Sequence, residues 1–448
     1  MYLTSTFGQH NHLVSRRGLL AGPREGALAG DGPGGVATAP MAAYALVDLH
    51  NRDHLAVVYG EDFAAAALRA LQWRLHLWGG SVATVDHRRF LVALPPLADQ
   101  AAAAREASAL PDARIEAWQQ ALFAQPFASQ GRRALLVVSV DRVQLPAHDY
   151  LDGRLPHLQE FEGQGMGVPA LPSLPCGWVG RLAYEADMEA ALAFHRALTQ
   201  GRVQLALQPV VSAGASGRAS GDDVLYQEAL LRVAACAGEP DMSACELVPA
   251  LERLGLVRLL DWVVLDAVVG QLEADPSLRL GCNLSAQSLV PGTGSWGGIF
   301  DRLRKARSVA ARLTLEITET APLPDFGQAV ELVKAMRQMG CQIAIDDFGA
   351  GYTRLDFVCA VAPQVIKLCG GLVRAASGSR TAADYLQHLA ALAGTLSPLV
   401  VAEGVGSQDE VLAASLAGVP WLQGRAVAPV TVGQPSIQLI LPVGMEQP

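Results

Sequence analysis

The amino-acid sequence predicts an α/β protein: a (β/α)₈ barrel of the TIM type with an antiparallel first strand, preceded by a smaller α+β domain. Three observations support this fold class. Strand-like apolar runs alternate with helical patterns from residue 203 onward. Nearly every one of these runs ends in a carboxylate, an amide or an ammonium group. Before residue 146 the order of patterns is instead β-α-β-β-α-β, which is typical of a small α+β domain.

Composition narrows the class of protein. The chain has 448 residues, of which 51% are hydrophobic and 17% are charged. This apolar content is enough for a sizeable core and excludes wholesale disorder. The formal net charge of −9 argues against a protein that coats DNA or RNA, because such binding needs clustered Lys and Arg. No run reaches the ~18 apolar residues that span a bilayer, so we expect no membrane span.

The sequence predicts a cytoplasmic location. The seven Cys form no C-x-x-C pair and several lie inside apolar runs, so we expect buried, reduced thiols. Residues 15–20 look like a twin-arginine export signal. Pro23, Arg24 and Glu25 then interrupt the apolar stretch that such a signal requires, so we do not expect export.

The first 184 residues divide into three parts. Residues 1–40 predict a flexible tail, 41–145 the α+β domain, and 146–184 a linker rich in Pro and Gly. In the α+β domain the patterns predict strands at 44–49, 81–84, 90–94 and 135–140, and helices at 62–78, at 97–110 and from 111 to 123. His50 and His54 stand four apart, but the residues between them indicate a surface turn rather than a metal site.

The barrel domain covers 185–436 and leaves 437–448 as a C-terminal tail. After a helix at 185–199, strands are expected at 203–210, 224–230, 278–284, 312–317, 342–346, 364–368, 398–402 and 419–422. Helical patterns lie at 245–273, 326–339, 381–395 and 408–416. The loop at 212–223 is too short for a crossover helix, so we expect the first two strands to pair antiparallel.

The strand ends of this predicted barrel carry the chemistry, because they meet at one mouth. The polar side chains there are Glu228, Asn283, Glu316, Asp346, Asp347, Lys367, Glu403 and Gln423. Carboxylates with an amide oxygen form a hard-oxygen site, which favours Mg²⁺ or Mn²⁺ over Zn²⁺. The adjacent Asp346 and Asp347 suit a pair of ions, which activates water for in-line attack on phosphorus. Lys367 adds a fixed cation that orients this water or offsets developing charge.

The motifs in this half of the chain resemble those of the EAL domain family, the cyclic di-GMP phosphodiesterases. In family order they are residues 207–211, 227–232 with the E-A-L signature itself, 283–285, 315–319, 346–352, 366–368, 402–405 and 423–424. The resemblance spans about 190–430 and is highly specific, because separate motifs agree in both identity and order.

The resemblance implies hydrolysis of one phosphodiester of cyclic di-GMP to linear pGpG, with two Mg²⁺ or Mn²⁺ ions per active site. By resemblance, Glu228, Asn283, Glu316 and Asp346 would hold one ion, and Asp346, Asp347 and Glu403 the second. By resemblance, the catalytic residues would be Lys367, Glu403 and Glu319. Lys367 would position the attacking water, and Glu319 would steady the D-D-F-G loop. Gln208, Leu230, Arg232 and Gln423 would contact the nucleotide. The family pattern also implies a homodimer formed through the EAL domain.

The chain departs from the family pattern at three positions. An acid commonly lies two residues after the lysine, where this chain has Cys369. Acids are also usual at the positions of Gln364 and Gly406. We expect these changes to affect rate and metal affinity, since losses around a metal site typically cost ~10–100-fold.

The α+β domain resembles a degenerate GGDEF domain, the cyclase module often fused ahead of EAL. Asp48 and the helix at 62–78 lie where the family has them. The signature position reads Asp86-His87-Arg88-Arg89-Phe90, so two arginines replace the acids that would serve metal binding and catalysis. The resemblance implies a catalytically dead domain that regulates or dimerises. An unrelated α+β sensor domain is the alternative.

Three functions are compatible with the sequence. The first is a metal-dependent cyclic di-GMP phosphodiesterase regulated by the dead N-terminal domain, which the complete set of metal-ligand positions favours. The second is a catalytically silent receptor that binds cyclic di-GMP and signals through a protein partner. The third is a barrel hydrolase acting on another phosphodiester, which a substrate panel would distinguish.

Overall fold

The computed structural model describes residues 41–79, 81–94, 113–146, 171, 173–213, 219–236, 242–290, 296–318, 322–350, 354–432 and 437. The tail at 1–40, the helix expected at 97–110, most of the expected linker and nearly all of the C-terminal tail lie outside these residues. The expected domain boundaries therefore stay predictions.

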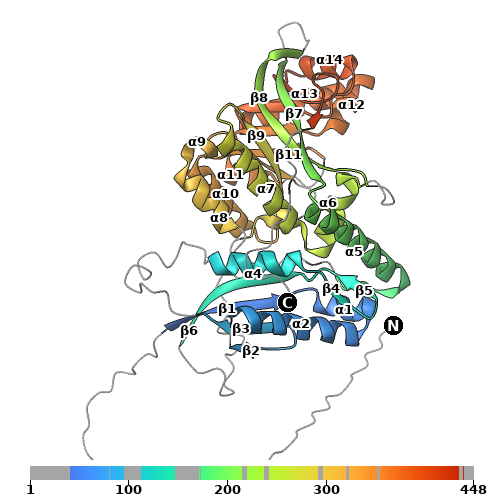
Figure 1. Cartoon of the computed structure of the whole chain (residues 1–448). Coiled ribbons are helices and arrows are strands. Elements are labelled where there is room, and N and C mark those ends of the chain that lie inside the picture. Colours follow the sequence, from blue (N-terminus) through green and yellow to red (C-terminus); the bar gives the residue numbers. More distant parts are fainter. Residues whose placement is uncertain are drawn as a thin grey trace, which may run out of the picture. The chain divides into compact units, whose positions relative to one another are not determined.

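The α+β part contains a four-stranded antiparallel sheet in the order β2-β3-β1-β6 (Figure 1). Its strands are β1 (Met41–Leu49), β2 (Val82–Thr84), β3 (Arg89–Ala93) and β6 (Val138–Pro146), and β4 (Phe127–Ser129) pairs with β5 (Arg132–Ala134). Its helices are α1 (Arg52–Tyr59), α2 (Glu61–Gly79) and α4 (Ala113–Ala124). Helix α2 buries Phe63, Leu71 and Leu75, whose helical spacing predicted it.

The expected surface turn at residues 51–53 is wrong. Helix α1 begins there instead, and both His50 and His54 are buried. The cause is Asn51, whose side chain donates to the Leu135 carbonyl and accepts from the Val137 N–H, both at 3.0 Å. These bonds hold the start of α1 against the segment before β6. Burial lowers the pKa of His50 to about 4, and its Nε2 lies 2.8 Å from Ser139 Oγ.

The second half of the chain is the predicted (β/α)₈ barrel (Figure 1). Its strands are β7 (Val203–Ala213), β8 (Ala219–Val233), β9 (Leu280–Ser285), β10 (Leu313–Thr318), β11 (Gln342–Phe348), β12 (Val365–Leu368), β13 (Leu399–Ala402) and β14 (Trp421–Leu422). Strand β7 runs antiparallel to β8 and β14, which closes the barrel, whereas the pairs from β8 to β14 are parallel. A further strand, β15 (Thr431–Val432), pairs with β7. The expected strands and the antiparallel first pair are thus confirmed.

The helices of this half are α5 (Gly177–Thr199), α6 (Ala244–Leu254), α7 (Val257–Ala274), α8 (Gly297–Lys305), α9 (Arg307–Ala310), α10 (Phe326–Met339), α11 (Leu355–Val361), α12 (Gly370–Gly378), α13 (Arg380–Leu396) and α14 (Gln408–Leu416). The helical pattern expected at 245–273 is confirmed, but it is divided between two helices, α6 and α7. Gly255 adopts a left-handed φ of 72° and ends α6, so that α7 starts in a new direction. Helix α5 begins at Gly177, within the segment expected to be linker.

The interior of the barrel has an apolar layer below its mouth. Val210, Tyr226, Ala344, Val365 and Val401, from five strands, form one buried cluster. Their inward-facing side chains fill the barrel so that it is a packed core rather than a pore. Polar side chains further along the same strands are thereby confined to the strand ends.

The cysteines are only partly as expected. All seven lie in the described residues and all are free thiols, but only Cys282 and Cys341 are buried. Cys176, Cys236, Cys245 and Cys359 are exposed, because an apolar run also occurs on helix surfaces and in loops. No described helix is both long enough and apolar enough to cross a bilayer.

Candidate active site

The centre of the barrel mouth is Lys367 on β12, whose side chain is fully buried. Its Nζ lies 3.1 Å from Glu228 Oε2 on β8 and 3.2 Å from Asp346 Oδ1 on β11. It also pairs with Glu316 on β10 and with Glu403, which directly follows β13. Four carboxylates predicted from separate motifs are therefore brought together around one ammonium.

Glu228 is also the meeting point of the predicted amide side chains. Asn283 on β9 donates from Nδ2 to Glu228 Oε1 at 2.6 Å. Gln423, just after β14, donates from Nε2 to Glu228 Oε2 at 2.6 Å and to Gln208 Oε1 at 3.5 Å. Buried oxygens of this group keep no hydrogen-bond partner: Asn283 Oδ1, Glu316 Oε1 and Gln423 Oε1. Orphaned acceptors of this kind are suited to an electropositive ligand.

Burial and mutual repulsion shift the pKa values in this cluster so that some of its carboxyl groups retain protons. Burial opposes the charge on Lys367, but the surrounding carboxylates outweigh it and hold the lysine pKa well above its usual value. Burial, aided by the charge of Glu228, raises the pKa of Glu316 to about 8. Burial also raises the pKa of Glu403 well above its usual range, with Asp346 contributing. Asp346 is buried too, yet the charge of Lys367 keeps its pKa below the usual value.

The donor set fits a divalent cation. Oxygen atoms of Glu228, Glu316 and Glu403 all lie within 4.8 Å of one another. Carboxylate oxygens with an unpartnered amide oxygen are the ligands that Mg²⁺ and Mn²⁺ prefer. A bound cation would also replace the protons that these crowded acids otherwise hold.

Asp347 extends the acidic group at the end of β11. Its φ of 53° is left-handed, an uncommon conformation for a residue other than glycine. Burial and the charge of Asp346 raise the pKa of Asp347, and its side chain is hydrogen-bonded to that of Cys369. Cys369 thus occupies a place beside the acids, as its position in the sequence suggests.

The remaining predicted residues are more peripheral. Leu230 is half-buried, two residues beyond Glu228 on β8. Arg232 is exposed and donates to the Leu231 carbonyl at 2.8 Å, so the structure does not draw it into the carboxylate cluster. Glu319 lies outside the described residues, and its expected role stays a prediction.

Sequence reasoning missed Tyr226 and Gly281. Tyr226 is buried, burial raises its pKa well above the usual value, and its hydroxyl has no hydrogen-bond partner. A Cβ on Gly281 would lie 2.1 Å from Glu316 Oε1 and 2.6 Å from Tyr226 Cε2, so only glycine leaves room for both side chains. The signal for Tyr226 was its position two residues before Glu228, which places both on one face of the strand.

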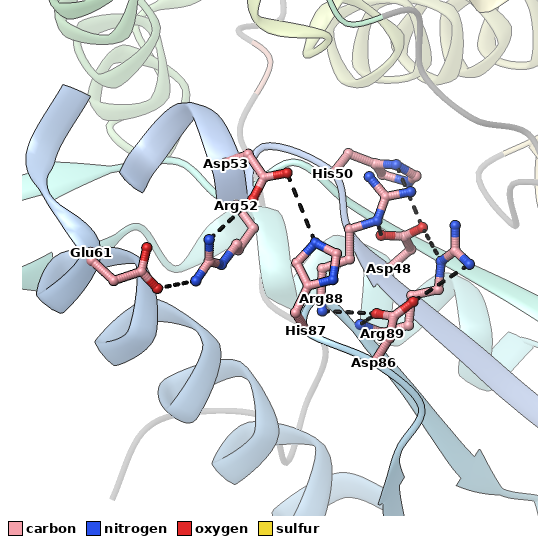
Figure 2. A network of polar contacts seen from close by, with 9 residues as sticks. All are labelled: Asp48, His50, Arg52, Asp53, Glu61, Asp86, His87, Arg88 and Arg89. Carbon is pink, nitrogen blue, oxygen red and sulfur yellow. Dashed lines mark hydrogen bonds and ion pairs between the residues drawn. The ribbon is translucent and has the colours of Figure 1, made fainter. Parts of the chain in front are cut away.

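A second polar cluster belongs to the α+β part (Figure 2). Asp48 on β1 accepts from Arg89 Nε at 2.9 Å and pairs with Arg88 Nε at 3.2 Å. Asp86 accepts from the backbone N–H groups of Arg88 and Arg89, both at 2.9 Å, which fixes the turn between β2 and β3. The hairpin expected around this turn is confirmed. Both arginines thus pair with Asp48, a contact that the sequence did not predict.

The fold and the site define a (β/α)₈ barrel protein with a cluster of buried carboxylates at the barrel mouth. The model of the EAL domain family matches residues 191–430, and the chain belongs to this family. The resemblance drawn from the motifs is thereby confirmed.

Two curated proteins that are similar to this chain are named as cyclic di-GMP phosphodiesterases. The chain is 32% identical over 173 residues to Cyclic di-GMP phosphodiesterase PA2567 of Pseudomonas aeruginosa, covering 38% of this chain and 29% of that protein. It is 29% identical over 209 residues to Cyclic di-GMP phosphodiesterase PdeF of Escherichia coli K12, covering 45% of this chain and 27% of that protein. Among solved structures, the PaMucR phosphodiesterase in complex with c-di-GMP is 25% identical with a TM-score of 0.46, covering 54% of this chain and 97% of that one. The chain thus spans less than a third of the length of these two curated relatives.

Proposed function

We propose that the barrel hydrolyses cyclic di-GMP to linear pGpG in a metal-dependent reaction. The observation that carries this proposal is the convergence of Glu228, Glu316, Asp346 and Glu403 on one buried lysine, with Asn283 and Gln423 bound to the same glutamate. The names of the similar phosphodiesterases support the same substrate.

Each residue receives a role in this proposal. Glu228, Asn283, Glu316 and Asp346 would hold one Mg²⁺ or Mn²⁺, and Asp346, Asp347 and Glu403 the second. Bound metal would supply a water with a lowered pKa and neutralise charge on the phosphate. Lys367 would place a positive charge beside the attacking water and the phosphate oxygens. Gln208, Leu230, Arg232 and Gln423 would contact the nucleotide, and Glu319 would keep its expected role toward the D-D-F-G loop.

The assembly around the barrel belongs to the same proposal. The α+β part would be a degenerate GGDEF domain that regulates turnover. Arg88 and Arg89 form ion pairs with Asp48, the acid with which a cyclase would bind its metal ion. A homodimer through the EAL domain and a regulatory protein partner complete this part of the proposal. We place the protein in the cytoplasm, where free thiols such as its seven cysteines persist.

A silent cyclic di-GMP receptor is the second candidate. One observation favours it: Cys369, instead of the acid common in the family, is hydrogen-bonded to Asp347. A neutral thiol beside a metal ligand stabilises a bound cation less than a carboxylate does. Cys369 would therefore weaken the binding of the second metal ion, which Asp347 helps to hold, before that of the first.

The proposal is tested with Glu228→Ala in the full chain. Glu228 is the acid that Lys367, Asn283 and Gln423 share, so its loss should abolish metal-dependent pGpG formation. Glu331→Ala is the matched control, since Glu331 is an exposed acid of α10 that pairs with Lys334. Undiminished turnover by Glu228→Ala would contradict the assigned metal site. Tight cyclic di-GMP binding without turnover by the unmodified chain would favour the receptor.

A further inference from the structure

A buried polar network lies behind the metal-ligand strand β9 and takes no part in the chemistry described so far. Segment 285–290, which starts at the last residue of β9, is held by three ionisable side chains: Glu252 of α6 and Arg258 and Asp261 of α7. Their exposed fractions are only 8%, 8% and 6%. The network therefore lies inside the protein rather than at its surface.

Asp261 makes the central contacts of this network. Its Oδ2 accepts from the backbone N–H of Ser285 at 2.9 Å and from Ser288 Oγ at 2.5 Å. Glu252 Oε1 accepts from Ser285 Oγ at 2.8 Å. Arg258 donates to the Val290 carbonyl at 3.2 Å. Backbone and side chain of Ser285 are thus both fixed by carboxylates from the helices behind the strand.

Stability alone is a weak reason for such a network. Taking charged groups out of water is expensive, and apolar residues of similar volume often stabilise a core equally well. Capping is a weak reason too, because Ser285 Oγ itself accepts from the N–H of Gln287 and so caps the short helical turn Ala286–Ser288. The carboxylates fix the position of the segment more than its helical form.

The position that they fix is that of Asn283. Asn283 and Ser285 lie two residues apart on β9, in register with Glu316 and Thr318 of β10. Asn283 donates to Glu228 and leaves its Oδ1 without a partner in the barrel mouth. A shift of Ser285 along or away from the strand would carry this amide oxygen with it.

We propose that Asp261, supported by Glu252, is a positioning residue that sets the amide oxygen of Asn283 for the first metal ion. This inference rests on the proposed function, since it assumes that Asn283 ligates a divalent cation. Asp261 acts only through the backbone and hydroxyl groups of the segment after β9. It is therefore expected to alter metal affinity without touching metal or substrate.

The test measures Mn²⁺ affinity of the full chain by titration calorimetry, without substrate. Asp261→Ala should weaken binding by about 10- to 100-fold, the usual cost of losing a group that orients a metal ligand. Asp261→Asn should recover most of the affinity, because its amide oxygen can still accept from the Ser285 N–H. Ser397→Ala is the control for the loss of a buried hydrogen bond outside the network, because the Ser397 hydroxyl donates to the Leu399 carbonyl at 3.2 Å, just before β13 begins.

Unchanged Mn²⁺ affinity in a folded Asp261→Ala variant would overturn the inference, while leaving the proposed function intact. An unmodified chain that binds no Mn²⁺ would instead overturn the proposed metal site and this inference with it. Circular dichroism and thermal melting establish folding. If Asp261→Ala does not fold, Ser285→Ala tests the inference in its place. This variant loses the hydrogen bond to Glu252 but keeps the one from the backbone N–H of residue 285 to Asp261. Its Mn²⁺ affinity should fall severalfold, and an unchanged value would overturn the inference.

Discussion

At the scale of single residues, the charge balance of the barrel mouth depends on protons as well as on Lys367. Glu316 illustrates this, because burial and Glu228 raise its pKa to about 8. The same side chain is a full carboxylate near neutral pH in the unfolded chain. The metal-free folded protein therefore carries protons that its unfolded form has released.

This difference makes the stability of the metal-free protein fall as pH rises. An acid whose pKa is raised on folding keeps its proton in the folded state, so stability is lost between its unfolded and folded pKa values, from about pH 4.5 to about pH 8 for Glu316. Asp261, with a pKa of about 7, acts in the same direction. We expect the unfolding midpoint in chelator to drop between pH 6 and pH 8, measured by calorimetry. Mn²⁺ should offset this drop, because cations displace the protons. A midpoint in chelator that rises over this range would contradict the assignment.

At the scale of elements, the polar residues at the strand ends could be predicted from the sequence, but the residues that pack around them could not. A polar residue at the end of a buried strand, such as Glu316 or Lys367, stands out against its apolar neighbours. Tyr226 and Gly281 do not stand out, because an aromatic residue and a glycine are ordinary in strands. Helix α1 was missed because Asn51 begins it through long-range bonds to residues 135 and 137, which no local pattern contains.

Gly281 provides the test at this scale. In Gly281→Ala the added Cβ would meet Glu316 Oε1 at 2.1 Å and the Tyr226 ring at 2.6 Å, so strand β9 or the two side chains must move. Overpacking of this kind typically costs about 1–3 kcal/mol in the free energy of unfolding, and Mn²⁺ affinity should fall with it. The measurements are denaturant unfolding and metal titration.

Gly394→Ala is the control for this substitution. Gly394 lies in α13 with no atom within 4 Å of its Cβ position, so alanine there should stabilise the helix by about 0.5–1 kcal/mol. If Gly281→Ala behaved like Gly394→Ala, the close approach of Gly281 to Glu316 would not matter to the site.

At the scale of the whole molecule, the chain combines a barrel whose mouth gathers carboxylates around Lys367 with an α+β part in which Asp48 is paired with Arg88 and Arg89. Arg88→Ala tests this division of labour. Asp48 keeps its contact with Arg89, so the fold of the α+β part should survive and turnover of cyclic di-GMP should stay nearly unchanged. The measurement is the steady-state rate beside the unmodified chain. A large loss of rate would mean that the α+β part supplies something essential to hydrolysis.

We propose above that the carboxylates around Lys367 form a metal site that hydrolyses cyclic di-GMP. The most direct test of this proposal incubates the full chain and cyclic di-GMP with Mn²⁺, with Mg²⁺ or with chelator, and resolves the products by chromatography. We expect linear pGpG with either metal and none with chelator. Absence of pGpG under both metals, with cyclic di-GMP still bound, would contradict it and make the protein a receptor.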